Sequence, residues 1–428
     1  MNRHIYAAIA SLILTICCLG AADAQPNQKP KLMAGVGKSD ITPPVGTPLA
    51  GYEARHGEPS KGVHDPTEAR ALIIDSGGQK LALLSVDHLG FDHRMVDRTR
   101  AIASRATGIP PHAIFVMSSH THSGGGAYMR IVPSLGQFLT GRYDPRVRAV
   151  YERRAAEAII AANRDMKAAR IAFGSGEVRG ISRFRSTWPP DGPVDPEIGV
   201  IRVDFAATGK PMAVLMNFAV HPTVLGSENM EFSADFVAYA RRGLERLIGG
   251  GVMAIFANGA EGTIGPVSLQ DVSQWQRAES IGNALAAEAY KVALRLRPRD
   301  GVEVEVSHTP LEMKLDVPKQ FAQGVTMKRY RTEVAAVSFD DRVALVAIPG
   351  EMSSMLGSKI KARGRLLGFD QTFILGVTND WLGYIVTEDE YRHHTYEASI
   401  SFFGPAFGSF ITNEAFQILE GLRPIEKK

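Results

Sequence analysis

Short apolar segments alternate with amphipathic stretches along most of this chain of 428 residues. Eight apolar runs have the length and continuity of buried strands. They are Ala71–Ile74, Leu81–Val86, Ala113–Met117, Gly199–Phe205, Met212–Phe218, Val252–Ala257, Val343–Ile348 and Phe373–Val377. Helical patterns occupy Asp144–Ala162, Asp235–Leu247, Val272–Leu294 and Met352–Leu366. The alternation predicts an α/β fold in which a largely buried mixed β-sheet is flanked by helices.

No internal repeat or shift of composition divides the chain into units. Glycine and proline concentrate at residues 40–51, 124–143 and 186–195, where we expect loops. Asp235, directly before Phe236, is placed to cap the second predicted helix. We therefore predict one large domain over residues 32–428.

The first residues have the pattern of an export signal. Arg3 precedes the apolar run Ile5–Leu19, and Ala22-Asp23-Ala24 is a small-residue cleavage site. The run is short for a membrane span, which needs about 20 residues. We predict a signal peptide at residues 1–24, a polar leader at 25–31, and a secreted or periplasmic protein. Both cysteines, Cys17 and Cys18, lie in this signal, so a metal site in the exported chain must use nitrogen and oxygen ligands.

Composition places the chain among ordinary globular proteins and argues against one class of partner. Hydrophobic residues make up 45% of it, and the formal net charge is only +3. The lysines and arginines are scattered rather than clustered on one segment, so we expect no nucleic-acid partner.

Polar side chains that can bind a metal follow five of the predicted strands. The segments are His120-Thr-His-Ser-Gly124, His221-Pro222, Asn258 to Pro266, Glu351, and Asn379 to Tyr384. Ligands of open α/β sheets bind outside the carboxyl ends of strands, so these segments are expected to share one rim.

The His-x-His pair has a geometric meaning. In an extended segment residues i and i+2 point to the same side, so His120 and His122 would face one site. They can supply two ligands, or one ligand and one free imidazole. From the residues alone, a hydrogen-bonded loop pair remains an alternative, Glu351 can simply favour the start of its helix, and Tyr384 can be an ordinary half-buried tyrosine.

Taken together, the segments resemble the neutral/alkaline non-lysosomal ceramidase family, zinc amidases that release fatty acid from ceramide. The similarity spans nearly all of the chain after the signal and covers the family's N-terminal catalytic domain. Its motifs are Ala34-Gly-Val-Gly-Lys-Ser-Asp40, Gly51-Tyr52, His120-Thr-His-Ser-Gly124, Phe218-Ala-Val-His-Pro222, Ile181-Ser-Arg-Phe184, Pro349-Gly-Glu351, Gly383-Tyr384 and Tyr391 to Glu397.

The resemblance implies a role for each of seven residues. The Zn²⁺ ligands would be His120, His221, Glu351 and Tyr384. The remaining three would act on the substrate: His122 would shuttle protons, and Arg183 and Tyr396 would stabilise the oxyanion. Zinc-bound hydroxide would attack the amide carbonyl, because zinc lowers the pKa of bound water to about 7.

Two departures from the family concern the substrate more than the reaction. Gly265 stands where the family signature has a serine with an assigned catalytic part, and a zinc-hydroxide mechanism survives that change. Ceramidases of the family also carry an immunoglobulin-like domain after the catalytic one, and this sequence ends at Lys428, soon after the Tyr396 motif. Thr263, nearby, either lends a hydroxyl to the substrate or is a turn residue.

The sequence therefore predicts an exported zinc-dependent amidohydrolase that cleaves an N-acyl amide, with a ceramide-like lipid as the expected substrate. A zinc hydrolase of a different small amide or ester, and a secreted binding homologue without activity, are the alternatives. A small-molecule or lipid substrate and peripheral contact with a membrane are the partners that we consider, and the oligomeric state stays open.

Overall fold

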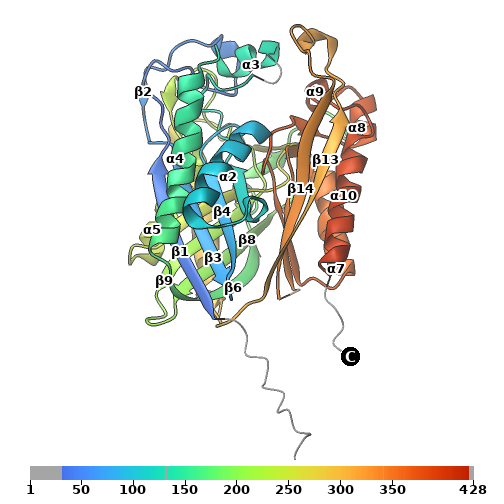
Figure 1. Cartoon of the computed structure of the whole chain (residues 1–428). Coiled ribbons are helices and arrows are strands. Elements are labelled where there is room, and N and C mark those ends of the chain that lie inside the picture. Colours follow the sequence, from blue (N-terminus) through green and yellow to red (C-terminus); the bar gives the residue numbers. More distant parts are fainter. Residues whose placement is uncertain (1–30, 131–132, 341, 424–428) are drawn as a thin grey trace, which may run out of the picture.

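The computed structural model describes residues 31–130, 133–340 and 342–423 (Figure 1). The predicted signal peptide, and all of the leader except Lys31, lie outside the described residues. Within the described ranges, no helix combines the length and the apolar character that crossing a membrane requires. The α/β class with a mixed sheet is confirmed.

The larger sheet has eight strands and mixed pairing. Its two outermost pairs, β11 with β9 and β4 with β5, are parallel, whereas the inner neighbours are antiparallel. In spatial order the strands are β11 (Met253–Asn258), β9 (Pro211–Phe218), β8 (Glu197–Phe205), β6 (Lys167–Glu177), β1 (Leu32–Asp40), β3 (Glu68–Ser76), β4 (Gln79–Val86) and β5 (Ile114–Ser118).

A second sheet of four strands packs face to face on the first. It contains β13 (Val304–Lys314), β14 (Arg329–Phe339), β15 (Val343–Ala347) and β17 (Gln371–Leu375), in that order. Leu215 and Phe115 of the larger sheet meet Phe373 of the smaller one in a shared core. Val214 and Met216, on either side of Leu215, point to the opposite face, as the two-residue period of a strand requires.

Helices cover the two outer faces and complete four layers (Figure 1). Those on the larger sheet are α2 (His93–Thr107), α4 (Pro145–Arg164), α5 (Phe236–Ile248) and α6 (Gln274–Arg295). Those on the smaller sheet are α7 (Ser354–Leu366) and α10 (Phe407–Gly421). Asp235 caps α5 as predicted, because its carboxylate accepts the Phe236 N–H at 2.6 Å.

Short elements connect these layers and form much of the region near the strand ends. The helical ones are η1 (Glu53–Arg55), η2 (Pro111–Ala113), α3 (Pro133–Thr140), η3 (Lys319–Phe321), α8 (Glu388–Arg392) and α9 (Tyr396–Ser399). The short strands pair as β2 (Gly62–Val63) with β10 (Glu231–Phe232), β7 (Ser182–Phe184) with β12 (Ile264–Pro266), and β16 (Glu351–Met352) with β18 (Tyr384–Ile385).

Each of the eight predicted strands and four predicted helices overlaps an element of the structure, but the sequence did not separate the two sheets. Four further strands of the two sheets, β1, β6, β13 and β14, were not predicted. β13 is an edge strand in which only Val304 and Leu311 are buried, and it contains Pro310, which edge strands tolerate.

A buried ion pair between Asp87 and Arg241 fastens the end of β4 to α5. The two guanidinium nitrogens of Arg241 donate to Asp87 at 2.9 and 2.6 Å, and both side chains are almost fully enclosed. Removing one partner of such a pair leaves an uncompensated buried charge.

We therefore expect Arg241→Met to lower the free energy of unfolding by about 3–5 kcal/mol. The matched control, Arg329→Met, breaks the exposed pair with Glu312 and should cost less than about 1 kcal/mol. Urea unfolding followed by circular dichroism measures both. Equal effects of the two variants would show that the Asp87–Arg241 pair contributes nothing special to the fold.

Candidate metal centre and substrate cleft

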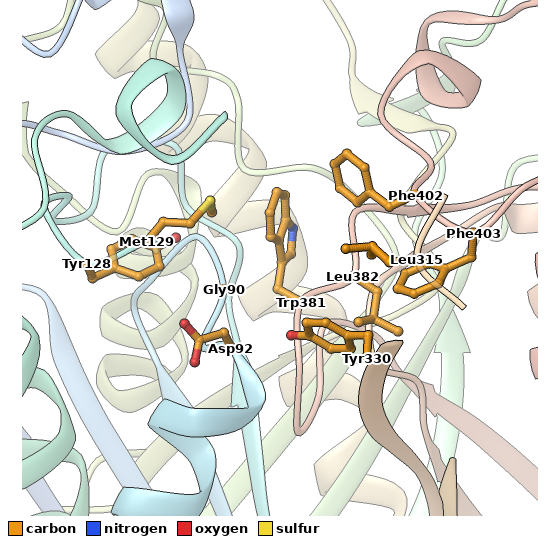
Figure 2. A pocket seen from close by; sticks show the side chains of 10 residues that line it. All are labelled: Gly90, Asp92, Tyr128, Met129, Leu315, Tyr330, Trp381, Leu382, Phe402 and Phe403. Carbon is orange, nitrogen blue, oxygen red and sulfur yellow. The ribbon is translucent and has the colours of Figure 1, made fainter. Parts of the chain in front are cut away.

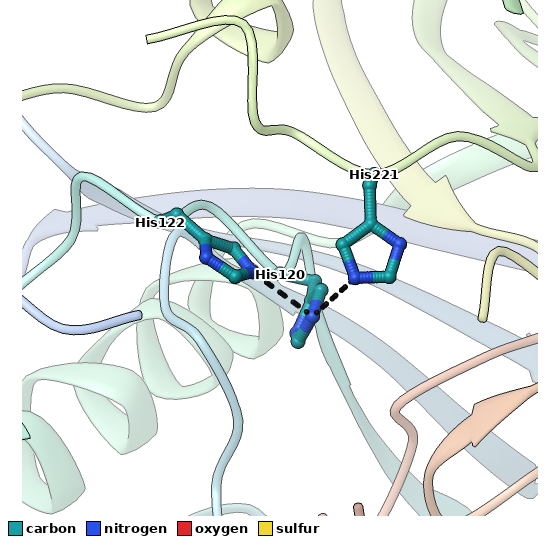
Figure 3. A group of neighbouring side chains, drawn as sticks. All are labelled: His120, His122 and His221. Atoms are coloured by element: carbon teal, nitrogen blue, oxygen red, sulfur yellow. Dashed lines mark hydrogen bonds between the residues drawn. The ribbon is translucent and has the colours of Figure 1, made fainter. Parts of the chain in front are cut away.

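Two histidines converge directly after β5. The Nε2 atoms of His120 and His122 lie 3.3 Å apart (Figure 3). The convergence was predicted, but the segment is not extended, because His120 has a left-handed φ of 69°. Such a backbone conformation is uncommon for a residue other than glycine and is often found at functional sites.

His221 and Glu351 complete the cluster from two other strand ends. His221 follows β9, and its Nε2 lies 3.1 Å from Nε2 of His120. Oε2 of Glu351 lies 3.1 Å from His221 Nε2 and 3.2 Å from His120 Nε2. All three side chains are buried. One carboxylate oxygen and two imidazole nitrogens therefore converge on the same buried position.

Backbone carbonyls fix the tautomers of His120 and His221. Nδ1 of His120 is 2.6 Å from the Leu89 carbonyl, and Nδ1 of His221 is 3.0 Å from the Glu261 carbonyl. A carbonyl only accepts, so we assign the proton to Nδ1 and a lone pair to Nε2 in each neutral ring. In that state both Nε2 lone pairs point toward the same position, where a metal ion could accept them.

The spacing of these donor atoms suits zinc. Ligand atoms 2.0–2.1 Å from a tetrahedral zinc are about 3.3 Å from one another, close to the separations seen here. His120, His122 and His221 all offer nitrogens within 4.8 Å of one another. The cluster can therefore hold a metal ion.

Electrostatics keeps most of the cluster in the protonation states that a metal requires. Burial, assisted by the positive charge of Arg185, lowers the pKa of His221 to about 3. Burial alone would raise the pKa of Glu351, but the charge and hydrogen bonds of His120 and His221 outweigh it and hold that pKa well below its usual value. Burial alone would lower the pKa of His120, but the negative charge of Glu351 raises it.

His122 differs from the other two imidazoles in its second nitrogen. Its Nδ1 is buried and has no hydrogen-bond partner within the described part of the chain. Its ring packs on Tyr52, and a Cβ at Gly51 would lie only 2.6 Å from it, so glycine is required there. Burial lowers the pKa of His122 well below its usual value, which keeps the ring neutral. This imidazole has no carbonyl to fix its tautomer, unlike the two tethered rings.

Tyr384 and an arginine border the cluster. Tyr384 lies on β18, paired with Glu351 of β16, and its hydroxyl is 2.8 Å from Nη2 of Arg185. The same nitrogen lies 3.1 Å from His221 Nε2 and donates to the Gly262 carbonyl at 3.0 Å. Arg185 also faces Glu397 at 3.7 Å.

The structure brings six of the seven predicted site residues to this cleft and places the seventh, Arg183, on the exposed surface of β7. His221 contacts the cleft residues directly, and the cleft is lined by Gly51, Leu89, His120, His122, Leu139, Glu351, Trp381, Tyr384, Tyr396 and Ile400. Tyr396 is 61% exposed, with its ring 6.0 Å from that of Tyr384. Arg185, two residues after Arg183, is the arginine at the cluster. Both stand in one short segment: Arg183 lies within β7, and Arg185 comes directly after its end.

Gly265 and Thr263 lie on the arginine side of the cluster. A Cβ at Gly265 would meet Cδ of Arg185 at 3.2 Å, a close contact. Thr263 is buried and its hydroxyl is 3.0 Å from that of Ser354, at the start of α7. Thr263 therefore supports the fold of this loop.

An apolar cavity adjoins the cleft, and Trp381 lines both (Figure 2). Aromatic and aliphatic side chains form most of its wall, and Asp92 and Tyr330 add polar atoms at one end. The lining residues are Gly90, Asp92, Tyr128, Met129, Leu315, Tyr330, Trp381, Leu382, Phe402 and Phe403.

Sequence reasoning also missed Glu261, a fully buried carboxyl in the glycine-rich loop after β11. Neither of its side-chain oxygens has a hydrogen-bond partner among the described residues. Burial raises the pKa of Glu261 to about 8, so the group is largely protonated at neutral pH. The backbone carbonyl of Glu261 is the acceptor of the His221 Nδ1–H hydrogen bond. The sequence signal that could have revealed Glu261 is an acidic residue within the glycine-rich segment that follows a buried strand.

Together, the four-layer fold and the buried cluster define an α/β protein with a candidate metal centre at the ends of its strands. The chain belongs to the neutral/alkaline non-lysosomal ceramidase family, whose N-terminal model matches residues 32–271. The predicted family resemblance is thereby confirmed.

Named relatives and solved structures agree with this assignment. Neutral ceramidase A of Dictyostelium discoideum is 25% identical over 295 residues, which cover 60% of this chain and 40% of that protein. Neutral ceramidase B of the same organism is 33% identical over 76 residues, 16% of this chain and 11% of the relative. This chain thus spans less than half the length of the curated relatives that it matches.

Two solved structures share the fold. The neutral ceramidase from Pseudomonas aeruginosa superposes with a TM-score of 0.82 at 19% identity, over 93% of this chain and 76% of that one. A ceramidase complexed with C2 superposes with a TM-score of 0.81 at 18% identity, over 93% of this chain and 77% of that one.

The different tethering of the three histidines gives a prediction. His221→Ala removes an imidazole whose Nε2 lone pair is directed at the cluster. It should reduce bound zinc at least tenfold, from about one ion per chain, because a zinc site needs its full ligand set. His122→Ala, the matched control, should retain zinc. Elemental analysis after dialysis measures both, and full zinc content in His221→Ala would contradict the assignment.

Proposed function

We propose that this protein is an exported zinc-dependent amidohydrolase that cleaves the N-acyl amide of a ceramide-like lipid. The observation that carries the proposal is the pair of carbonyl-tethered imidazoles, His120 and His221, facing the Glu351 carboxylate beside an apolar cavity. Residues 1–24 would direct the chain to the periplasm or the external medium.

His120, His221, Glu351 and Tyr384 would hold the zinc ion. When bound, zinc supplies a Lewis acid and lowers the pKa of a coordinated water to about 7. The burial of the ligands excludes solvent and strengthens every charge interaction in the site.

His122 would move the proton. Because its ring is neutral, it can accept a proton from the attacking water. Once protonated in this buried position, it is a strong acid and would release that proton to the departing amine nitrogen. Because the buried Nδ1 has no acceptor among the described residues, the charged ring would not be stabilised and would hold the proton only briefly.

Arg185 and Tyr396 would stabilise the oxyanion. Arg185 is the cation in contact with His221 and Tyr384, so we assign to it the role that the family resemblance implied for Arg183. Tyr396 lies at the cleft with an accessible hydroxyl side chain. Well-placed donors of this kind each contribute a few kcal/mol.

The apolar cavity favours a lipid over a small polar amide. Met129, Leu382 and Phe402 give it an apolar wall, and Trp381 places it directly beside the proposed zinc ligands. Its volume of about 30 Å³ has room for only a water-sized group, so a hydrocarbon chain would enter only if these side chains moved apart. His122 lies on the Tyr52 side of the cluster, so the amine would leave on that side and the acyl chain would extend past Trp381. A non-catalytic binding role does not explain the conjunction of cluster, proton carrier and arginine.

Fatty-acid release from a panel of N-acyl lipids and small N-acyl amides tests the proposal, with His120→Ala as the blank. Release from ceramide by the wild type alone would support it, and would show that no serine is needed at position 265. Release only from small amides, with zinc bound, would move the substrate to the second class. Bound zinc without any turnover would favour the binding homologue.

Filling the cavity should change the preference for acyl length. Met129 is buried in its wall, so Met129→Trp should lower kcat/KM for a long acyl chain relative to a short one by about tenfold or more. Leu366→Trp, at an 80% exposed position at the end of α7, is the control and should leave the ratio unchanged. An unaltered ratio in Met129→Trp would remove the cavity from the substrate path.

A further inference from the structure

The two oxygens of the Glu351 carboxylate have separate partners. Oε2 faces the Nε2 atoms of His120 and His221, whereas Oε1 accepts the indole N–H of Trp381 at 2.8 Å. Both Glu351 and Trp381 are buried, so water cannot readily replace this bond. One oxygen is thereby directed to the cluster and the other away from it.

Trp381 is itself held rigidly. Its backbone N–H donates to Oδ1 of Asp380 at 2.8 Å, and Asp380 is buried. A Cβ at Gly90 would come within 2.6 Å of Cβ and Cγ of Trp381, so the indole packs directly on the Gly90 backbone. The rest of the ring forms the wall of the apolar cavity (Figure 2).

An indole nitrogen only donates, so it occupies a lone pair on Oε1 and offers the metal nothing itself. A carboxylate without such a partner can turn and present both oxygens to a cation. We propose that Trp381 is a positioning residue that holds Glu351 so that one oxygen alone, Oε2, binds the metal. The inference rests on the proposed function, because it requires a metal at this cluster.

Residues that hydrogen-bond to a metal ligand tune the affinity of the site for its metal, and the loss of such a residue lowers metal affinity about 10–100-fold. The variant Trp381→Phe keeps an aromatic wall on the cavity and removes the N–H. We expect its zinc dissociation constant, measured by competition with a chromophoric chelator, to rise about 10–100-fold. Tyr128→Phe is the matched control: it removes a buried hydroxyl from the same cavity that has no partner among the described residues, and its zinc affinity should be unchanged.

Cobalt reports the geometry independently of affinity and of turnover. In Trp381→Phe loaded with Co²⁺, Glu351 is free to add its second oxygen, so the visible d–d absorption should weaken as the coordination number rises. Thermal unfolding of the metal-free variants checks that both fold.

Equal zinc affinity and equal cobalt spectra in wild type and Trp381→Phe would overturn the inference and leave the proposed function intact. Failure of the folded wild type to bind either metal would instead overturn the proposed function, and this inference with it.

Discussion

The site depends on one constraint: two imidazole nitrogens with lone pairs are held 3.1 Å apart inside the protein. The Leu89 and Glu261 carbonyls impose it by accepting hydrogen bonds from the Nδ1–H groups of His120 and His221. The buried nitrogens and the Glu351 carboxylate oxygen therefore form a set of donor atoms that suits a divalent metal.

Segments that follow strands of both sheets contribute residues to this cluster. The larger sheet supplies the histidines after β5 and β9, whereas the segment after β15 and the β16–β18 pairing supply Glu351 and Tyr384. An isolated bridge between Met117 and Thr378 joins the strand ends of the two halves. Because neither sheet carries all of the proposed ligands, the cluster forms only when the sheets are packed, and a bound metal should stabilise that packing.

Much of this arrangement follows from the sequence, since apolar runs that end in histidine, glutamate or tyrosine give both the buried strands and the rim where ligands gather. Other parts depend on tertiary contacts. The positive φ of His120 could not be predicted, because histidine rarely adopts that backbone conformation. Arg183 and Arg185 are equivalent in pattern, and only the end of β7 separates them. Trp381 looks like a core residue, and its bond to Glu351 joins positions 30 apart in the chain.

Family membership establishes the fold, whereas the proposed chemistry depends on a metal bound at the histidine cluster. Locating that metal is therefore the most direct test of the proposal. Anomalous diffraction at the zinc edge, from crystals of the wild type grown with zinc, measures it. The account predicts one strong peak 2.0–2.2 Å from His120 Nε2, His221 Nε2 and Glu351 Oε2. An empty cluster, or zinc found only on surface side chains, would contradict it.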